Sequence, residues 1–288
     1  MGHLKRILKT LATFFYIMAL SAYSWVRGLF YRVFRRPIEF EGLAEMGKEL
    51  REKGFLVIKD YYSDAEIADI LHVVEEHMHE DMGDYDHINR VTYYRRPLSD
   101  QKWDGGVYRM FAAHALHPSI LKFRHDPKLR QIIETGFRTK LTSEATVIQK
   151  NLPVGTETRG FHVDMYAPRE FKAFLFLTDV FSESNGPYAI LRGSHRWQAK
   201  LLCNYLKRGV LHLDPVTTVG ELNEKELACL EKFWVRKGTV VLSIQQAIHR
   251  GWPHTQGRRL AVVNYYLEKF SNSTPDFNEE NRLGYRYN

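Results

Sequence analysis

The chain has 288 residues, of which 44% are hydrophobic and 26% are charged, and these proportions exclude a chain that is disordered throughout. Lysine and arginine number 41 against 34 for aspartate and glutamate, and the whole excess lies in residues 1–36, which contain seven basic side chains and no acidic one. The rest of the chain is therefore balanced in charge, which argues against nucleic acid as a partner. The two cysteines, Cys203 and Cys229, lack the spacing of a zinc or redox motif.

The first predicted element is an apolar helix between Lys9 and Arg27. Its 17 uncharged residues would span about 25 Å, slightly less than the ~30 Å hydrocarbon core of a bilayer. Aromatic and basic side chains are mixed at 28–36, as is typical of the headgroup region. We therefore expect residues 1–36 to associate with a membrane, the remainder of the chain facing the cytoplasm. The open alternatives are a spanning helix, an in-plane helix, a signal peptide cleaved near residues 19–21, and a helix packed on the protein's own core.

Residues 37–288 contain no internal repeat and no low-complexity tract, so we expect one domain. Apolar residues at helical spacing predict helices at 41–53 and 63–80, with a strand at 54–58 between them. Ser63 and Glu66 have the spacing of a capping box at the start of the second helix. Residues 81–106 predict a long loop of the kind that covers an active site, and further helices are expected at 117–124 and 127–137.

From residue 144 onwards the pattern changes to short apolar or alternating segments separated by turn formers. Such segments favour a β-sandwich or barrel with helices packed outside it, so the expected class is mainly β with flanking helices. An insertion at 201–233 interrupts the series and is expected to contain a helix at 223–233. The predicted strands are 145–150, 161–165, 171–180, 188–192, 239–244 and 260–267.

His162 and Asp164 stand two positions apart in one of these predicted strands. Residues at that spacing point to the same face of a strand, so two metal-binding groups converge there. A distant second histidine would complete a face of two histidines and one carboxylate, which leaves open positions on an octahedral iron. The pair is a weak signal by itself, because most such pairs are ordinary surface or core residues.

Several motifs follow the pair in a fixed order: Asn185-Gly-Pro187, Arg192-Gly-Ser-His-Arg196, His249-Arg-Gly-Trp-Pro253, and the two arginines at 258 and 259. The ordered set resembles the phytanoyl-CoA hydroxylase family of Fe(II)/2-oxoglutarate dioxygenases over residues 54–267. The resemblance implies a double-stranded β-helix, a cupin-like jelly roll, as the core at about 144–268. It also implies that His162, Asp164 and His249 bind iron.

The resemblance further implies that an arginine after the distal histidine binds the far carboxylate of 2-oxoglutarate. A guanidinium suits this role because it can bond both carboxylate oxygens at once. Arg259 matches the family position and Arg258 is the alternative, since neighbours on a strand face opposite sides. Gln149 and Thr178 are expected either to contact the co-substrate or to satisfy a hydrogen bond of the barrel. His195 is expected to stabilise a turn.

The implied reaction uses 2-oxoglutarate and O₂ to oxidise an organic substrate. In halogenating relatives a small residue replaces the metal-binding acid, so Asp164 favours hydroxylation. The membrane-associated segment suggests a lipid, an acyl chain or a lipid-linked sugar as the substrate, to be selected by side chains at 81–110 and 165–170. A soluble metabolite is the alternative substrate, and a non-catalytic β-helix binding module is the remote alternative.

Overall fold

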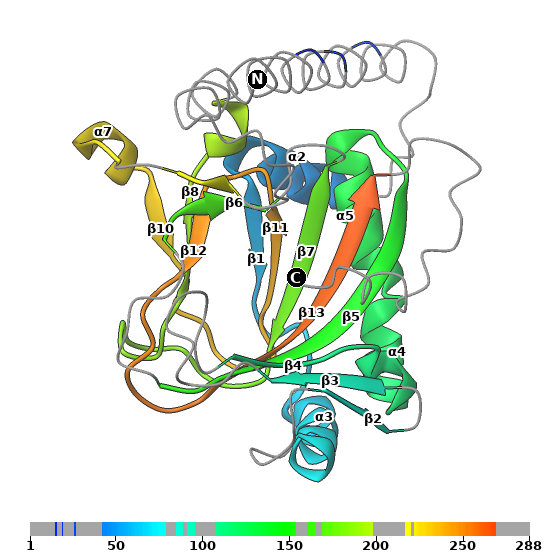
Figure 1. Ribbon diagram of the computed structural model, residues 1–288. Helices are drawn as coiled ribbons and strands as arrows, with labels where there is room; N and C mark the ends of the chain where they lie inside the picture. The colour runs from blue at the N-terminus through cyan, green and yellow to red at the C-terminus, as the bar shows by residue number, and fades with distance from the viewer. Residues whose placement is uncertain are drawn as a thin grey trace, which may run out of the picture.

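The computed structural model describes residues 42–78, 85–88, 91–95, 107–153, 160–164, 169–197, 217–219 and 222–268, together with Phe15, Ala19 and Val26. Two sheets lie next to each other, and helices cover the outer face of the larger one (Figure 1). Every strand pairing among the described residues is antiparallel. The predicted mainly β class is confirmed, and the two antiparallel sheets are consistent with a jelly-roll core.

The larger sheet has eight strands, and its two faces have different compositions. On its last strand in the chain, Leu260, Val262 and Tyr266 belong to the main core, whereas Ala261, Val263 and Tyr265 line a cavity between the sheets. The period of two along a strand therefore separates an apolar core face from a functional face. The strands, in spatial order, are β1 (Phe55–Ile58), β11 (Val240–Ile244), β7 (Glu170–Phe176), β13 (Arg259–Glu268), β5 (Leu141–Asn151), β4 (Val107–Met110), β3 (Val91–Arg95) and β2 (Tyr85–Ile88).

The smaller sheet has five short strands and its own small apolar cluster. Val163, Leu191, Val219 and Ile248 form that cluster, each at most 5% exposed. The strands, in spatial order, are β10 (Leu230–Lys232), β8 (Tyr188–Leu191), β12 (His249–Gly251), β6 (His162–Val163) and β9 (Thr217–Thr218). The sheet thus carries the two predicted metal-binding histidines on adjacent strands.

Helices α2 (Leu43–Lys53) and α5 (Pro127–Phe137) cover the outer face of the larger sheet (Figure 1). The two helices approach closely at Gly47 and Gly136, where a Cβ atom added to Gly136 would lie 2.4 Å from the Gly47 carbonyl oxygen. The other helical elements are α3 (Asp64–His77), α4 (Pro118–Arg124), the short α7 (Glu224–Leu227) and the 3₁₀ turns η1 (Ala113–Ala115) and η2 (Ser194–Arg196). The apolar sides of α2, α3, α4 and α5 pack on the sheet to form the main core.

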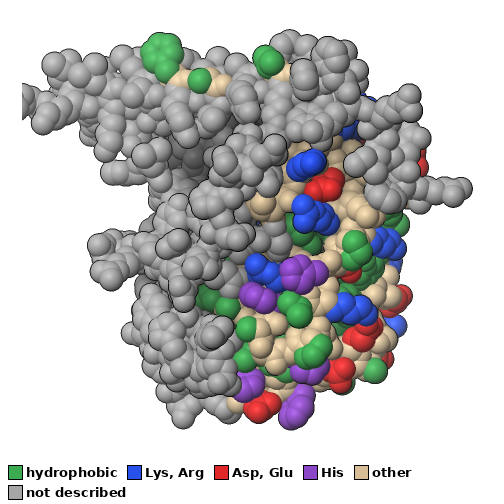
Figure 2. Space-filling model, turned by 90° about the vertical axis from the view of Figure 1, so that its right-hand side faces the viewer, with side chains coloured by type: hydrophobic (Ala, Val, Ile, Leu, Met, Phe, Trp, Pro, Cys, Tyr) green, Lys and Arg blue, Asp and Glu red, His purple; other side chains and the backbone are tan. Residues whose placement is uncertain are grey.

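The surface over the right-hand side of Figure 1 mixes both signs of charge. In Figure 2, basic and acidic side chains are interspersed over the described part of this face. Individual ion pairs occur between elements, for example Lys122 of α4 with Glu66 of α3 at 2.6 Å. Exposed pairs of this kind contribute little to stability, about 0–1 kcal/mol each, so the fold depends mainly on its apolar core.

Local signals predicted several elements correctly. Ser63 Oγ accepts a hydrogen bond from the Glu66 amide at 3.3 Å, and Glu66 Oε2 accepts one from the Ser63 amide at 2.9 Å, so the predicted capping box is confirmed. The loop predicted at 81–106 is partly wrong, because β2 and β3 form an edge hairpin there by backbone pairing onto β4. The helix predicted at 223–233 is only the single turn α7, since residues 230–232 pair with β8 instead.

The membrane-associated location and cytoplasmic orientation expected from residues 1–36 are corrected. None of the helices among the described residues combines the length and the apolar character that crossing a bilayer requires. Of that segment, only Phe15, Ala19 and Val26 belong to the described residues, and the remainder lies outside them. The run of 17 uncharged residues was already shorter than the ~20 apolar residues of a typical span.

Candidate active site

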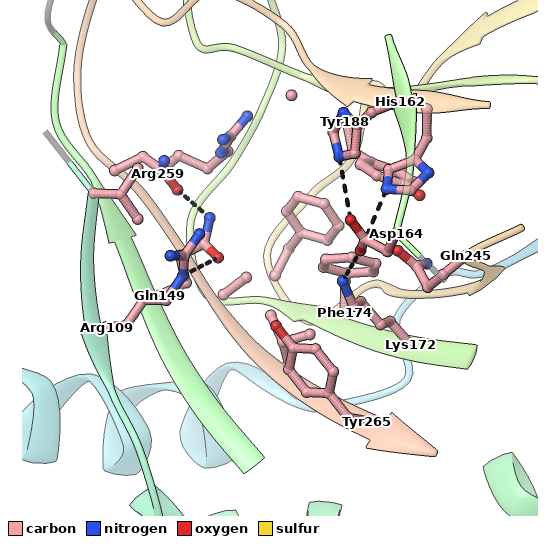
Figure 3. A pocket seen from close by; sticks show the side chains of 17 residues that line it. Arg109, Gln149, His162, Asp164, Lys172, Phe174, Tyr188, Gln245, Arg259 and Tyr265 are labelled. Atoms are coloured by element: carbon pink, nitrogen blue, oxygen red, sulfur yellow. Dashed lines mark hydrogen bonds and ion pairs between the residues drawn. The ribbon is translucent and has the colours of Figure 1, made fainter. Parts of the chain in front are cut away.

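The structure brings the three predicted metal ligands together. His162 on β6 and His249 on β12 are cross-strand partners whose ring centroids lie 4.4 Å apart. Asp164 follows β6, with its Oδ1 atom 3.4 Å from His162 Nε2 and its Oδ2 atom 3.6 Å from His249 Nε2 (Figure 3). One ligand atom from each residue lies within 4.8 Å of the other two, close enough for a single metal ion to contact all three.

Backbone contacts set the protonation of both imidazoles. His162 Nδ1 lies 2.8 Å from the Gly160 carbonyl oxygen, and His249 Nδ1 lies 2.8 Å from that of Ala247. A carbonyl oxygen only accepts, so each Nδ1 carries the proton and donates it, and each Nε2 keeps its lone pair. This arrangement is usual for metal-binding histidines, because it fixes the ring orientation and the tautomer. Two neutral imidazoles and one carboxylate therefore fit a divalent iron ion.

Asp164 bonds to a buried lysine, Lys172, which extends from β7. Burial alone raises the pKa of Asp164, but the adjacent Lys172 ammonium outweighs it, and the pKa stays well below its ordinary value. The carboxyl group is therefore ionised, which is its metal-binding form. Sequence reasoning missed Lys172, although a lysine inside a predicted apolar strand is an unusual feature that could have drawn notice.

The ligand cluster forms one end of a cavity of about 150 Å³ between the two sheets. In Figure 3, His162, Asp164 and Lys172 lie at one end, and Arg259, Gln149 and Arg109 lie at the other. The cavity therefore joins a metal-binding group to a group of polar and cationic side chains. The other lining residues are Val107, Asn151, Phe174, Phe176, Tyr188, Gln245, His249, Gly251, Ala261, Val263 and Tyr265.

The guanidinium of Arg259 lies against two glycines. A Cβ atom at Gly186 would lie 3.2 Å from Arg259 Nη1, and one at Gly251 would lie 3.4 Å from Nη2. Gly186 also has φ +63°, a left-handed conformation that favours glycine. Arg258 points away from the cavity, and its guanidinium is half exposed and lies 3.6 Å from Glu75. Only Arg259 of the two arginines lines the cavity.

Residues 50–261 match the family model described as phytanoyl-CoA dioxygenase (PhyH). The chain belongs to the phytanoyl-CoA dioxygenase family. The matched region runs from α2 into β13 and includes strands of both sheets together with His162, Asp164 and His249. The resemblance predicted from the ordered motifs is confirmed, and with it the assignment to the 2-oxoglutarate-dependent non-haem iron enzymes.

Solved structures of similar fold come from the same class of enzymes. The non-haem α-ketoglutarate-dependent epimerase SnoN from nogalamycin biosynthesis is 14% identical, with a TM-score of 0.56 over 78% of this chain and 82% of that one. HygX from Streptomyces hygroscopicus, with nickel and 2-oxoglutarate bound, is 16% identical, with a TM-score of 0.52 over 77% and 85%. EvdO2 from Micromonospora carbonacea var. aurantiaca, complexed with 2-oxoglutarate, is 14% identical, with a TM-score of 0.55 over 82% and 95%. These identities show a shared fold, and no curated protein sequence matches the chain.

The two weaker sequence candidates in this phytanoyl-CoA dioxygenase family member have different positions. Gln149 on β5 lines the cavity, accepts a hydrogen bond from Arg109 Nε at 3.4 Å and donates one to Asn151 Oδ1 at 2.9 Å. Thr178 is not among the described cavity-lining residues, and its hydroxyl accepts a hydrogen bond from the Leu260 amide at 3.0 Å. Thr178 therefore makes a hydrogen bond within the barrel, which is the second of the two roles expected for it. Arg109 was missed, because its position follows from the pairing of β4 with β5.

The motif at 193–195 supports the strand of the distal histidine. Ser194 Oγ accepts a hydrogen bond at 2.8 Å from the amide of Ile248, the residue before His249. His195 Nε2 donates to the Arg51 carbonyl oxygen at 2.9 Å, which ties the turn to the end of α2. These contacts agree with the structural role expected for His195.

Proposed function

We propose that this protein binds Fe(II) through His162, Asp164 and His249 and uses 2-oxoglutarate and O₂ to hydroxylate a small organic molecule. The observation that carries the proposal is the convergence of three ligand atoms within 4.8 Å, from two buried histidines and a partly buried aspartate. Because the chain supplies only these three ligands among its described residues, an octahedral iron would keep three positions for co-substrate and O₂. The presence of a carboxylate at 164 supports hydroxylation over halogenation.

We further propose that Arg259 binds the far carboxylate of 2-oxoglutarate. Its guanidinium lies at the end of the cavity opposite the metal ligands, which suits a co-substrate that reaches from the metal to the arginine. Gln149 lines the same end and is oriented by Arg109 and Asn151, so it is the second candidate contact. The structures of HygX and EvdO2, both of which contain bound 2-oxoglutarate, support this proposal.

When bound, Fe(II) with 2-oxoglutarate and O₂ supplies the oxidation, and 2-oxoglutarate is converted to succinate and CO₂. The residues of the chain bind, orient and shield the reactants. Arg259 neutralises a carboxylate, and the ionised Asp164 is available to a cation. Phe174, Phe176 and Val263 form an apolar wall of the cavity, which limits the access of water to the reacting atoms.

A small organic substrate is the class that the comparisons favour. SnoN of similar fold has been crystallised with Fe³⁺, α-ketoglutarate and nogalamycin RO, at a TM-score of 0.52. The lipid-type substrate expected from residues 1–36 rested on a membrane location that the structure corrects. A non-catalytic binding module is not favoured, because Arg259 and the three metal ligands lie in one cavity.

Iron binding and succinate formation test the proposal. Anaerobic loading with Fe(II), followed by 2-oxoglutarate and air, should yield succinate from the wild-type protein. Replacing His162, Asp164 or His249 by Ala should weaken iron binding by more than the roughly 10- to 100-fold typical of an outer-shell change, and succinate formation should fall with it. His72→Ala, at an exposed position on α3, is the matched control and should behave as wild type. Full iron occupancy in the alanine variants would refute the assignment.

A further inference from the structure

Lys172 occupies an unusual position for a lysine. Its side chain is 11% exposed and lies in the cavity wall, on the same face of β7 as Phe174 and Phe176. Lysine is seldom buried unless its charge is paired. The ammonium contacts Asp164 Oδ2, lies 3.5 Å from Glu170 Oε1 and sits 4.7 Å from the centre of the Tyr265 ring. Three different side chains therefore determine where this charge lies.

The backbone around Lys172 holds that charge rigidly next to Asp164. Tyr265 is the cross-strand partner of Lys172 on β13, and Ser243 is its partner on β11, so the lysine has a paired strand on each side. Glu170 is 4% exposed, and its carbonyl oxygen accepts a hydrogen bond from the Gln245 amide at 2.9 Å. The Gln245 carbonyl oxygen in turn accepts one from the Asp164 amide at 3.2 Å. The metal-binding aspartate is thus tied to the larger sheet, while both histidines belong to the smaller one.

The two oxygens of the Asp164 carboxylate have different surroundings. Oδ2 contacts the Lys172 ammonium and also lies 3.6 Å from His249 Nε2, whereas Oδ1 lies 3.4 Å from His162 Nε2. A carboxylate that is free to turn can bind a metal through one oxygen or through two. The second mode would occupy one more metal position, and that position is needed for 2-oxoglutarate or O₂.

We infer that Lys172 is a positioning residue that holds Asp164 by Oδ2, so that the carboxylate presents a single oxygen, Oδ1, to the metal. The inference rests on the proposed function and deepens it. Lys172 acts through Asp164 and keeps the number of protein ligand atoms at three. Glu170 and Tyr265 stabilise the Lys172 ammonium in its position next to Asp164 Oδ2.

The test compares three variants of the full-length chain. Lys172→Met removes the charge and keeps most of the side-chain volume, and Lys172→Arg keeps the charge. Because Lys172→Met leaves Glu170 buried without its ammonium, the double variant Glu170→Gln with Lys172→Met provides a second protein that avoids this cost. Lys150→Met is the matched control, since Lys150 is 8% exposed on β5, contacts the Tyr108 ring and does not line the cavity.

The decisive readout is the visible spectrum of Co(II) bound in place of Fe(II), recorded without 2-oxoglutarate, because its bands report the number of ligand atoms. We expect the bands to change in Lys172→Met and in the double variant, and to keep their wild-type form in Lys172→Arg and Lys150→Met. Succinate formation by the iron-loaded Lys172→Met protein should fall by about 10- to 100-fold, the range found for outer-shell partners of metal ligands, and Lys172→Arg should recover most of it.

Two results would overturn the inference. A wild-type Co(II) spectrum in both Met-containing variants would show that Asp164 binds in the same way without Lys172. The same spectrum combined with a raised 2-oxoglutarate requirement would make Lys172 a co-substrate ligand. Failure of the wild-type protein to bind Co(II) or Fe(II) would instead refute the proposed function, so the two failures are distinguishable.

Discussion

At the scale of single residues, Arg258 and Arg259 are neighbours in sequence with opposite surroundings. Arg259 faces the cavity, where Gly186 and Gly251 leave room for its guanidinium. Arg258 is half exposed and lies near Glu75 on α3. Side chains alternate between the two faces of β13, so the two arginines point to opposite sides. Replacing each of them should therefore have a different effect.

Arg259→Ala should raise the 2-oxoglutarate requirement strongly. Loss of a charge-assisted bidentate contact in a buried site costs roughly 2–4 kcal/mol, which corresponds to about 30- to 1000-fold. Arg258→Ala is the matched control and should change the requirement little. The measurement is the concentration of 2-oxoglutarate that gives half-maximal succinate formation, and the reverse pattern would assign the carboxylate contact to Arg258.

His195 should make stability depend on pH. Burial lowers its pKa to about 4, against the ordinary 6.5, and its Nδ1 atom has no hydrogen-bond partner among the described residues. Between these two pH values the unfolded chain binds the proton more readily. The stabilisation is therefore complete above pH 6.5 and is lost as the pH falls towards 4, by at most about 3 kcal/mol.

Urea denaturation of the metal-free protein at a series of pH values measures this effect. His195→Gln retains a donor towards the Arg51 carbonyl oxygen and removes the titrating ring. The variant should lose less stability than wild type between pH 6.5 and pH 4, because contributions from other groups are common to both proteins. Equal losses in the two proteins would contradict the prediction.

At the scale of elements, the packing of α2 on α5 depends on two glycines. A Cβ atom at Gly47 would lie 2.8 Å from the Gly136 amide nitrogen, and one at Gly136 would lie 2.4 Å from the Gly47 carbonyl oxygen. Both contacts are with backbone, which cannot move aside without separating the helices. The close approach in turn allows Leu50 and Ile132 to be fully buried in the main core.

Gly136→Ala should destabilise the protein even though alanine favours a helix by about 1 kcal/mol over glycine. Overpacking typically costs about 1–3 kcal/mol, and here the added methyl group meets the backbone of another helix. Lys48→Ala, an exposed change on α2, should stay within about 0.5 kcal/mol of wild type. Thermal unfolding compares the two, and a stabilised Gly136→Ala protein would show that the helices separate easily.

At the scale of the whole molecule, the main core draws its residues from Leu50 to Tyr266, and both predicted metal-binding histidines lie within that range. The division of the chain at residue 37 stays a prediction. It implies that folding and chemistry do not need residues 1–36.

Removal of residues 1–36 should leave folding and succinate formation intact. We expect a change in stability below about 1 kcal/mol, which is about 2–4 °C in melting temperature for a domain of this size or somewhat smaller. Calorimetry of the full chain and of residues 37–288, with a succinate assay on both, provides the measurement. A much larger fall in melting temperature would favour the alternative in which the N-terminal helix packs on the core.

The sequence by itself determined what depends on short separations along the chain. The spacing of His162 and Asp164 predicted a shared face because a strand has a period of two, and Ser63 and Glu66 predicted a helix start because a cap involves one turn. The ordered motifs predicted the family, and the alternating segments after residue 144 predicted the mainly β class. The hydropathy of residues 10–26 misled, since an apolar run of marginal length does not specify what it packs against.

Only the tertiary structure decided which distant side chains meet. Lys172 on β7 of the larger sheet contacts Asp164, which follows β6 of the smaller sheet, and Arg109 reaches Gln149 only through the pairing of β4 with β5. The β2–β3 hairpin likewise forms by backbone pairing at a sheet edge, where side chains carry little of the apolar alternation that identifies a strand. Sheet register and sheet-to-sheet packing arise from contacts across the whole fold, and no local pattern in the sequence specifies them.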